Sequence, residues 1–201
     1  MSTEKRKYEL KVRADRQRAT RERIVEATMQ LHQEVGPAAT TVAEIARRAG
    51  VQRLTVYNHF PDEAQLFGAC QAHWIALHPP PDFAAALALD EPLERVRAVL
   101  RGFYAWCRET ESMTENVQRD RASLPALDAL LRDTADAAAH EMADALATGL
   151  APRGGAAARS RVRVLVRVAL EFWTWHRLIA EGLGDDAAAD LMTDVVGRAA
   201  T

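Results

Sequence analysis

Length, composition and charge exclude several classes of protein. The 201 residues are 48% hydrophobic and 27% charged, which is typical of one or two globular domains and excludes a disordered or collagen-like chain. No run approaches the roughly 18 apolar residues of a membrane span. The charged start MSTEKRKYEL lacks the apolar run of a secretory signal. We therefore expect a soluble cytoplasmic protein, with Cys70 and Cys107 as buried thiols rather than a disulfide framework.

The charge is distributed unevenly along the chain. Residues 1–23 carry nine basic and four acidic side chains, a net charge of +5, although the whole chain has a formal charge of -2. A basic N-terminal extension, residues 1–15, suggests contact with phosphates. The alternatives are a solvated helix face and a plain disordered tail.

Helical patterns begin after this extension. The spacing predicts a first helix over 16–33, which Gly36 and Pro37 end. Thr41 and Glu44 form a T-x-x-E capping box and predict a helix over 42–48. The turn 49–51, which contains a glycine, leads into another short helix over 53–60.

The rest of the chain is also predicted to be helical, and no convincing strand pattern is present. Asp62 caps a helix that ends at the triple proline 79–81, which is the clearest boundary in the chain. Pro92 opens the next helix, followed by helices over 114–121 and 125–150. The segment 152–158 is predicted to be a loop. The fold class is all-α, with about nine helices.

The last two predicted helices indicate a homodimer. The helix over 159–181 is apolar around most of its circumference, so it must be buried on several sides. The final helix offers a matching apolar stripe: Ala188, Leu191, Met192, Val195 and Ala199. Two such helices from each chain would seal a dimer. The alternative is a monomer with one large core.

The two short helices over 42–48 and 53–60 form a helix-turn-helix pattern, which alone does not establish DNA binding. The segment TVAEIARRAGV, residues 41–51, followed by TVYNHFPD, residues 55–62, and Leu66 resembles the TetR family of bacterial transcriptional regulators. The preceding segment RERIVEA matches as well. The resemblance covers about residues 16–66 and implies a three-helix DNA-binding domain there. It also implies an effector-binding and dimerisation domain over 67–201.

The resemblance places Thr41 at a backbone-phosphate contact and six residues on a recognition helix: Arg53, Leu54, Thr55, Tyr57, Asn58 and His59. Arg53 can pair with guanine, and Thr55, Tyr57 and His59 can donate to phosphates. Arg47 and Arg18 are further candidates, and a solvated helix charge is the alternative for Arg47.

Three positions depart from the family pattern. Gln52 stands where members usually have serine, and Leu54 where they have a small residue. Glu63 replaces a phosphate-binding lysine, which removes an attraction and adds a repulsion near DNA. We therefore expect binding that is weaker or that depends on other charges.

The resemblance also implies an effector cavity in the C-terminal helices. Its candidate lining is aromatic and flexible: Phe103, Trp106, Met113, Met142, Phe172, Trp175 and His176. Ordinary core packing is the alternative for each of them. The hypothesis is an apolar or aromatic small molecule.

Other functions have less support. Cys70, His73 and His78 do not share one helix face well enough for a metal site, and no cofactor or catalytic motif is present, so no enzyme is expected. The sequence predicts a cytoplasmic regulator, in repressor mode, that binds a palindromic double-stranded operator as a homodimer and is released by a small effector. A helical protein-interaction adaptor and a regulator without ligand response are the alternatives.

Overall fold

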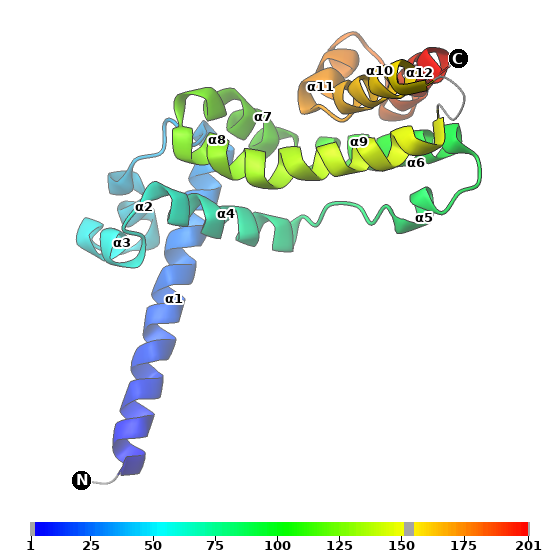
Figure 1. Ribbon diagram of the computed structural model, residues 1–201. Coiled ribbons are helices and arrows are strands. Elements are labelled where there is room, and N and C mark those ends of the chain that lie inside the picture. Colours follow the sequence, from blue (N-terminus) through cyan, green and yellow to red (C-terminus); the bar gives the residue numbers. More distant parts are fainter. Residues whose placement is uncertain (1–2, 151–154, 201) are drawn as a thin grey trace. The chain divides into compact units, whose positions relative to one another are not determined.

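The computed structural model describes residues 3–150 and 155–200, which are helices and their connections without any strand (Figure 1). The predicted all-α class is confirmed. The chain divides into two compact units: Met1–Pro79 with Asn116–Leu130, and Pro80–Glu115 with Leu131–Thr201. None of the described helices is long and apolar enough to cross a membrane.

The first unit is built on four helices and the segment 116–130. The four helices are α1 (Thr3–Val35), α2 (Val42–Ala49), α3 (Arg53–His59) and α4 (Glu63–Leu77). The segment contains the end of α7 (Glu111–Asp120), a 3₁₀ turn (Arg121–Ser123) and most of α8 (Pro125–Leu131). α1 packs against both α2 and α4.

The predicted capping residues set the starts of α2 and α4. The Thr41 hydroxyl accepts a hydrogen bond from the Glu44 N–H, and the Asp62 carboxylate accepts one from the Gln65 N–H. Gly50 ends α2 at a φ of 64°, in the left-handed region that glycine adopts without steric cost. These caps leave only a short turn between α2 and α3.

α1 is much longer than its predicted range of 16–33. It is one helix of 33 residues that begins at Thr3, so the basic extension is continuous with it. The physical reason lies in composition, because residues 3–15 contain neither glycine nor proline and are rich in Lys, Arg and Glu, which favour helix.

The core of the first unit lies where α1, α2, α3 and α4 meet. Ile24, Val56 and Ile45 are 0%, 1% and 2% exposed. Phe60, Leu66 and Cys70 belong to the same buried cluster. This core fixes α3 through one side chain of its own, Val56, and leaves the rest of that helix at the surface.

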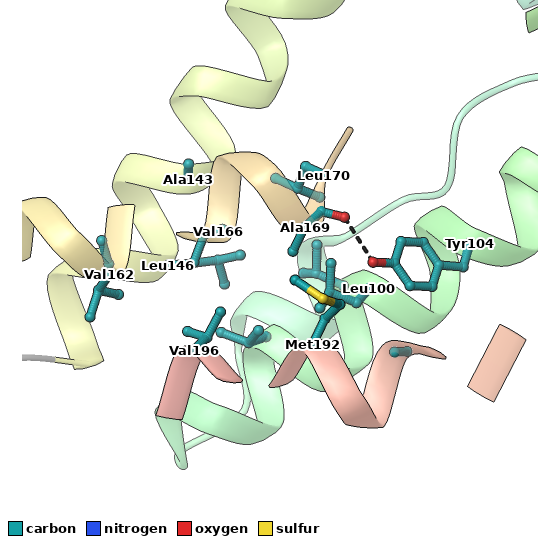
Figure 2. Close-up of a cluster of buried hydrophobic side chains, with 14 of the residues drawn as sticks. Leu100, Tyr104, Ala143, Leu146, Val162, Val166, Ala169, Leu170, Met192 and Val196 are labelled. Carbon is teal, nitrogen blue, oxygen red and sulfur yellow. Dashed lines mark hydrogen bonds between the residues drawn. The ribbon is translucent and has the colours of Figure 1, made fainter. Parts of the chain in front are cut away.

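The second unit packs six helices around a larger core and also contains the start of α7. The helices are α5 (Ala84–Leu87), α6 (Pro92–Glu109), α9 (Ala137–Leu150), α10 (Gly155–Ala169), α11 (Phe172–Ala180) and α12 (Asp185–Ala200). Figure 2 shows side chains of α6, α9, α10 and α12 converging on the centre of this core. Pro92 stands at the first turn of α6, as predicted.

The predicted single helix over 159–181 is wrong, because α10 ends at Ala169 and α11 begins at Phe172. Glu171 adopts an extended conformation between them, with ψ of 132°. The Tyr104 hydroxyl of α6 donates a hydrogen bond of 2.9 Å to the Ala169 carbonyl oxygen, which the break leaves without an intrahelical partner (Figure 2). The break turns α11 away from the α10 axis, so the apolar residues do not surround one rod.

Two further boundaries differ from the predictions. Residues 155–158 of the predicted loop 152–158 belong to α10, where Ala156, Ala157 and Ala158 favour helix; residues 152–154 lie outside the described part. The helix predicted over 125–150 is interrupted by one π-helical turn, Arg132–Asp136, between α8 and α9. The chain passes from the first unit to the second at Leu130/Leu131, next to this turn.

Candidate DNA interface and effector region

α3 exposes a mixed apolar and polar face. Leu54 is 65% exposed and Tyr57 is 53% exposed, which is unusual for side chains of this size. Asn58 is exposed on the same side of the helix. Arg53, at the first position of α3, is exposed as well. Because Val56 holds the opposite side in the core, this face is rigidly presented to solvent.

The other predicted contact residues surround this face less openly. Thr55 and His59 are half-buried. Thr41 is exposed at the start of α2, but its hydroxyl oxygen already accepts the Glu44 N–H at 3.2 Å. A hydroxyl oxygen that accepts this bond can still donate its proton to a phosphate, so the capping role and the predicted contact are compatible.

Two of the predicted cationic contacts are already paired. Arg47 donates to the Glu44 carboxylate at 2.9 Å, and this hydrogen bond lowers the pKa of Glu44. Arg18 donates to Asp15 at 2.5 Å. All four side chains are partly or fully accessible, and such exposed pairs contribute little to stability, so a phosphate can compete for either arginine.

α1 crosses the helix-turn-helix near its middle. The Arg21 guanidinium lies 4.8 Å from the centroid of the Phe60 ring, the residue that follows α3. An Arg23 nitrogen lies 3.7 Å from the position that a Cβ on Gly50 would take, beside the turn between α2 and α3. These two contacts locate the point at which α1 leaves the core of its unit. The sequence did not predict these contacts, because helical periodicity shows which residues share a face of a helix but not which segment packs against that face.

A second feature that the sequence did not reveal joins the end of α1 to the end of α7. Asn116 donates to the backbone oxygens of His32 and Gln33, at 3.1 Å and 2.9 Å. Arg119 donates to the Val35 oxygen at 3.3 Å. The Asp120 carboxylate accepts the Ala38 N–H at 3.0 Å. The Gln33 and Val35 carbonyl groups at the end of α1 thus accept hydrogen bonds from side chains of a distant segment, and the His32 carbonyl accepts one in addition to that from the Gly36 N–H.

Charge and burial tune the ionisable groups at this joint. Burial lowers the pKa of His32 from 6.5 to about 4, although the nearby Asp120 carboxylate acts in the opposite direction. Burial alone would raise the pKa of Asp120, but the Arg119 side chain and the Ala38 N–H bring it below its ordinary value. At neutral pH the joint therefore contains a neutral imidazole and an ionised carboxylate.

The seven predicted effector residues all belong to the second unit, and several lie close together. The rings of Phe172 and Trp175 are 5.4 Å apart, and those of Phe172 and His176 are 5.6 Å apart. Phe103 and Trp106 stack on α6 at 6.3 Å, and α6 contacts α11.

Burial separates these seven side chains into two groups. Phe172, Trp175 and Met113 are buried, whereas Phe103, Trp106, Met142 and His176 are half-buried. Trp175 is 0% exposed, and its indole N–H donates to the Asp185 carboxylate at 2.9 Å. The half-buried group is the part of the predicted lining that a ligand can reach with the smallest rearrangement.

The second unit also exposes apolar side chains on α10 and α12, two helices that contact each other. Val164 and Val168 of α10 are 54% and 43% exposed, and Leu191 and Val195 of α12 are 45% and 38% exposed. Both pairs have i, i+4 spacing, so each forms a stripe along its helix. The adjacent hollow is lined by Ala157, Ser160, Arg161, Val164, Leu165 and Ala199. None of the predicted effector residues lines this hollow.

The apolar stripe predicted on the final helix as part of the dimer surface is divided in the structure. Ala188 and Met192 are buried in the core, whereas Leu191 and Val195 are exposed. The inward face is completed by Ala189, Thr193 and Val196. At about 3.6 residues per turn, Met192 and Val196 lie to one side of Ala188, and Val195 and Leu191 lie to its other side, so the stripe straddles the edge of the buried face.

The candidate metal ligands Cys70 and His73 of α4, and His78 at its end, engage separate partners, and Cys107 lies on α6. His73 lies 2.9 Å from the Glu26 carboxylate, and His78 stacks on Trp74 with ring centroids 4.0 Å apart. Burial raises the pKa of the Cys70 thiol to about 12 and also raises that of Cys107, so both are poor nucleophiles. In the part of the chain that the structure describes, no three potential metal ligands converge.

Comparison with known proteins agrees with this geometry. Residues 24–70, from the buried part of α1 to the middle of α4, match the family model for bacterial regulatory proteins of the tetR family. The BetI transcriptional regulator of Yersinia pestis is 33% identical over 84 residues, which are 41% of this chain and 42% of that protein. The chain thus matches about two fifths of the length of this curated relative.

Solved structures extend the similarity to nearly the whole chain, at the level of the fold. NalD of Pseudomonas aeruginosa, the secondary repressor of the MexAB-OprM multidrug efflux pump, has a TM-score of 0.60 and 22% identity, covering 90% of this chain and 94% of NalD. A transcriptional regulator from Saccharomonospora viridis in complex with choline has a TM-score of 0.52 and 15% identity, covering 89% and 93%.

A helix-turn-helix domain followed by a separate helical unit defines the class of bacterial helix-turn-helix regulators. Within this class, the match of residues 24–70 to the tetR family model points to one family. The N-terminal domain is thus similar to the DNA-binding domain of the TetR family, and nearly the whole chain has the fold of a TetR-like regulator.

Proposed function

We propose that this chain is a homodimeric transcriptional repressor that binds a palindromic operator through α3 and responds to a small effector. The observation that carries the proposal is the face of α3. Leu54 and Tyr57 are more than half exposed on a helix whose opposite side is fixed in the core by Val56. A rigid exposed helix at the end of a helix-turn-helix is the element that enters the major groove in this class of protein.

Each α3 side chain has a role that fits its chemistry and position. Arg53 would pair with the O6 and N7 atoms of guanine, and Asn58 with the N6 and N7 atoms of adenine. Leu54 would pack against a thymine methyl group, so the departure from a small residue would change the preferred base rather than abolish binding. Tyr57 would contact the phosphate backbone.

The flanking residues would hold the helix in register. Thr41, Thr55 and His59 would donate to phosphates, and Arg47 and Arg18 would do so after exchanging their carboxylate partners. Glu63, exposed at the start of α4, would oppose this attraction. The balance favours binding that depends on cations outside α3.

Two copies of the chain would associate through α10 and α12. The exposed stripes of Val164 and Val168, and of Leu191 and Val195, supply an apolar surface that a monomer would leave in water. A two-fold axis would place the α10 and α12 stripes of one copy against the same α10 and α12 stripes of its partner. The two α3 helices would then read the half-sites of a palindrome, about 34–36 Å apart.

The effector would enter beside the half-buried aromatic side chains of the second unit. Phe103, Trp106 and His176 offer ring faces, and Met142 offers a flexible wall. An apolar or aromatic small molecule fits this lining. The choline complex of the Saccharomonospora viridis regulator supports the view that this fold can hold a small molecule.

Release from DNA would follow from differential binding. An effector that binds better to a conformation with wrongly spaced α3 helices shifts the protein towards that conformation and lowers its affinity for DNA. By linkage, bound DNA lowers the affinity for the effector by the same factor. α7 is the natural path for this coupling, because it starts in the second unit and ends at the joint with α1 in the first. The repressor name of NalD supports repression as the mode.

The test is selection of an operator from a pool of random duplexes by the purified dimer, followed by binding measurements with α3 variants. Arg53→Ala and Tyr57→Ala should each weaken binding to the selected duplex at least tenfold, because each removes a direct contact. Arg177→Ala is a suitable control, since Arg177 is paired with Glu181 on the surface of α11. Selection of no common sequence, or unchanged affinity in both α3 variants, would refute the proposal.

A further inference from the structure

The part of α1 that precedes the core carries an unusual amount of positive charge. We call residues 7–20 the basic arm. Its five cationic side chains are all exposed: Lys7, Lys11, Arg13, Arg16 and Arg18. Glu9 and Asp15 are the acidic residues of the arm, which leaves a net charge of +3.

Most of this charge is not neutralised by the protein. Arg18 pairs with Asp15, but within the described residues no ion pair involves Lys7, Lys11, Arg13 or Arg16. The second unit differs, because Arg97 and Arg101 both lie against Asp190, and Arg108 lies against Asp185. The arm therefore presents cations that are available to an external anion.

The arm leaves its unit next to the helix-turn-helix. Arg21 lies against Phe60 at the end of α3, and Arg23 lies beside Gly50 in the turn. Residues 7–20 continue the same straight helix beyond these contacts for about 21 Å (Figure 1). Any duplex that α3 engages is consequently within a short distance of the base of the arm.

The arm has only a short apolar stripe with which to join another helix. Tyr8 and Val12 share one side at i, i+4 spacing, but Leu10 lies on the opposite side and the stripe continues into Asp15 and Arg16. A coiled coil with a second copy needs apolar residues at alternating intervals of three and four. The composition thus favours a polyanionic partner over a second arm.

We propose that the basic arm is a second DNA-binding surface, which contacts backbone phosphates beside the base pairs that α3 reads. The proposal rests on the proposed function, because it takes the duplex held by α3 as the partner. Contacts to phosphates supply affinity and salt dependence but no base preference. The arm offsets the repulsion by Glu63 and leaves base recognition to α3.

The test is the salt dependence of DNA affinity in a charge-neutralised arm. The variant K7Q/K11Q/R13Q/R16Q removes the four unpaired cations and keeps residues that favour helix. The matched control K7R/K11R/R13K/R16K preserves every charge. Affinity is measured against salt for the selected operator duplex and for a shuffled duplex of the same length.

The neutralised variant should lose affinity for both duplexes by the same factor. The slope of log K against log salt should fall by about 0.9 for each phosphate contact removed, up to about 3.6 per protomer. The control should match the natural chain. An unchanged slope in the neutralised variant, with unchanged helix content and dimerisation, would overturn the proposal.

The two duplexes separate this proposal from the function on which it rests. Equal affinity of the natural chain for both duplexes would refute sequence-specific regulation, whereas the slopes would still report whether the arm contacts phosphate. Specific binding with equal slopes in natural and neutralised chains would leave the regulator intact and refute the arm contact.

Discussion

The two halves of α1 are continuous in backbone but differ in what holds them. Residues 21–35 pack in the core of the first unit, with Ile24 fully buried and the carbonyl groups of the helix end bonded by Asn116 and Arg119. Residues 7–20 expose nearly all of their side chains. Packing therefore stabilises residues 21–35, whereas only helix propensity and local side-chain pairs stabilise residues 7–20.

The largest effect is expected at the buried half of the helix. Ile24→Ala removes a side chain that is 0% exposed and leaves a cavity among α1, α2 and α4. The free energy of unfolding should fall by about 3–4 kcal/mol in denaturant titrations. A loss below about 1 kcal/mol would show that this half is not held by its core.

The joint at the end of the helix should be nearly as sensitive. Gly36 has a φ of 92°, and an added Cβ would overlap the Arg119 and Asp120 side chains. Gly36→Ala should destabilise the protein by about 2–3 kcal/mol, because it combines backbone strain with displacement of the joint. Gly182→Ala provides the control, since Gly182 also has positive φ but an added Cβ there meets open space. Equal losses in both variants would contradict a specific role of the joint.

Protonation of His32 probes the same joint through pH. The folded pKa is about 4 and the ordinary value is 6.5, so the unfolded chain binds the proton first as the pH falls. The contribution to stability is complete above pH 6.5 and is lost towards pH 4, by at most about 3 kcal/mol. Stability measured against pH should fall less steeply over this range in His32→Gln. Parallel curves for the two chains would argue against a buried neutral imidazole.

The smallest effect on global stability is expected in the basic arm. Ala14 is exposed, so Ala14→Gly should change the free energy of unfolding by less than about 0.5 kcal/mol. Helix content by circular dichroism should nevertheless decrease, because glycine disfavours helix by about 1 kcal/mol at the site. Ala27→Gly is the buried counterpart and should cost more than 1 kcal/mol. A large loss of stability in the arm variant would show that the arm packs against something.

Local chemistry made part of the fold predictable. Thr41, Asp62 and Pro92 mark helix starts through bonds within a few residues, and the structure confirms all three. The helix-turn-helix is equally local, since Gly50 sets the turn. The predicted contact residues of α3 lie together on or beside one exposed face for the same reason, although their contacts with DNA stay predictions.

Contacts between distant segments were not predictable from one sequence. At the break, the Ala169 carbonyl accepts a hydrogen bond from Tyr104, which is 65 positions away, and at the joint Asp120 accepts one from Ala38, which is 82 positions away. Periodicity also could not separate Met192, which is buried, from Leu191, which is exposed. A stripe shows that a helix has an apolar side, but the packing of its neighbours decides how much of that side is covered.

The proposed function depends on the reading of base sequence by the exposed face of α3. The most direct measurement is competition between the selected operator and a shuffled duplex of equal length for the purified protein at physiological salt. A specific regulator should prefer the operator by at least about 1,000-fold, and Arg53→Ala should reduce that preference. Equal affinity for the two duplexes, lost together as salt increases, would mean that the protein holds DNA by charge alone and would contradict the account.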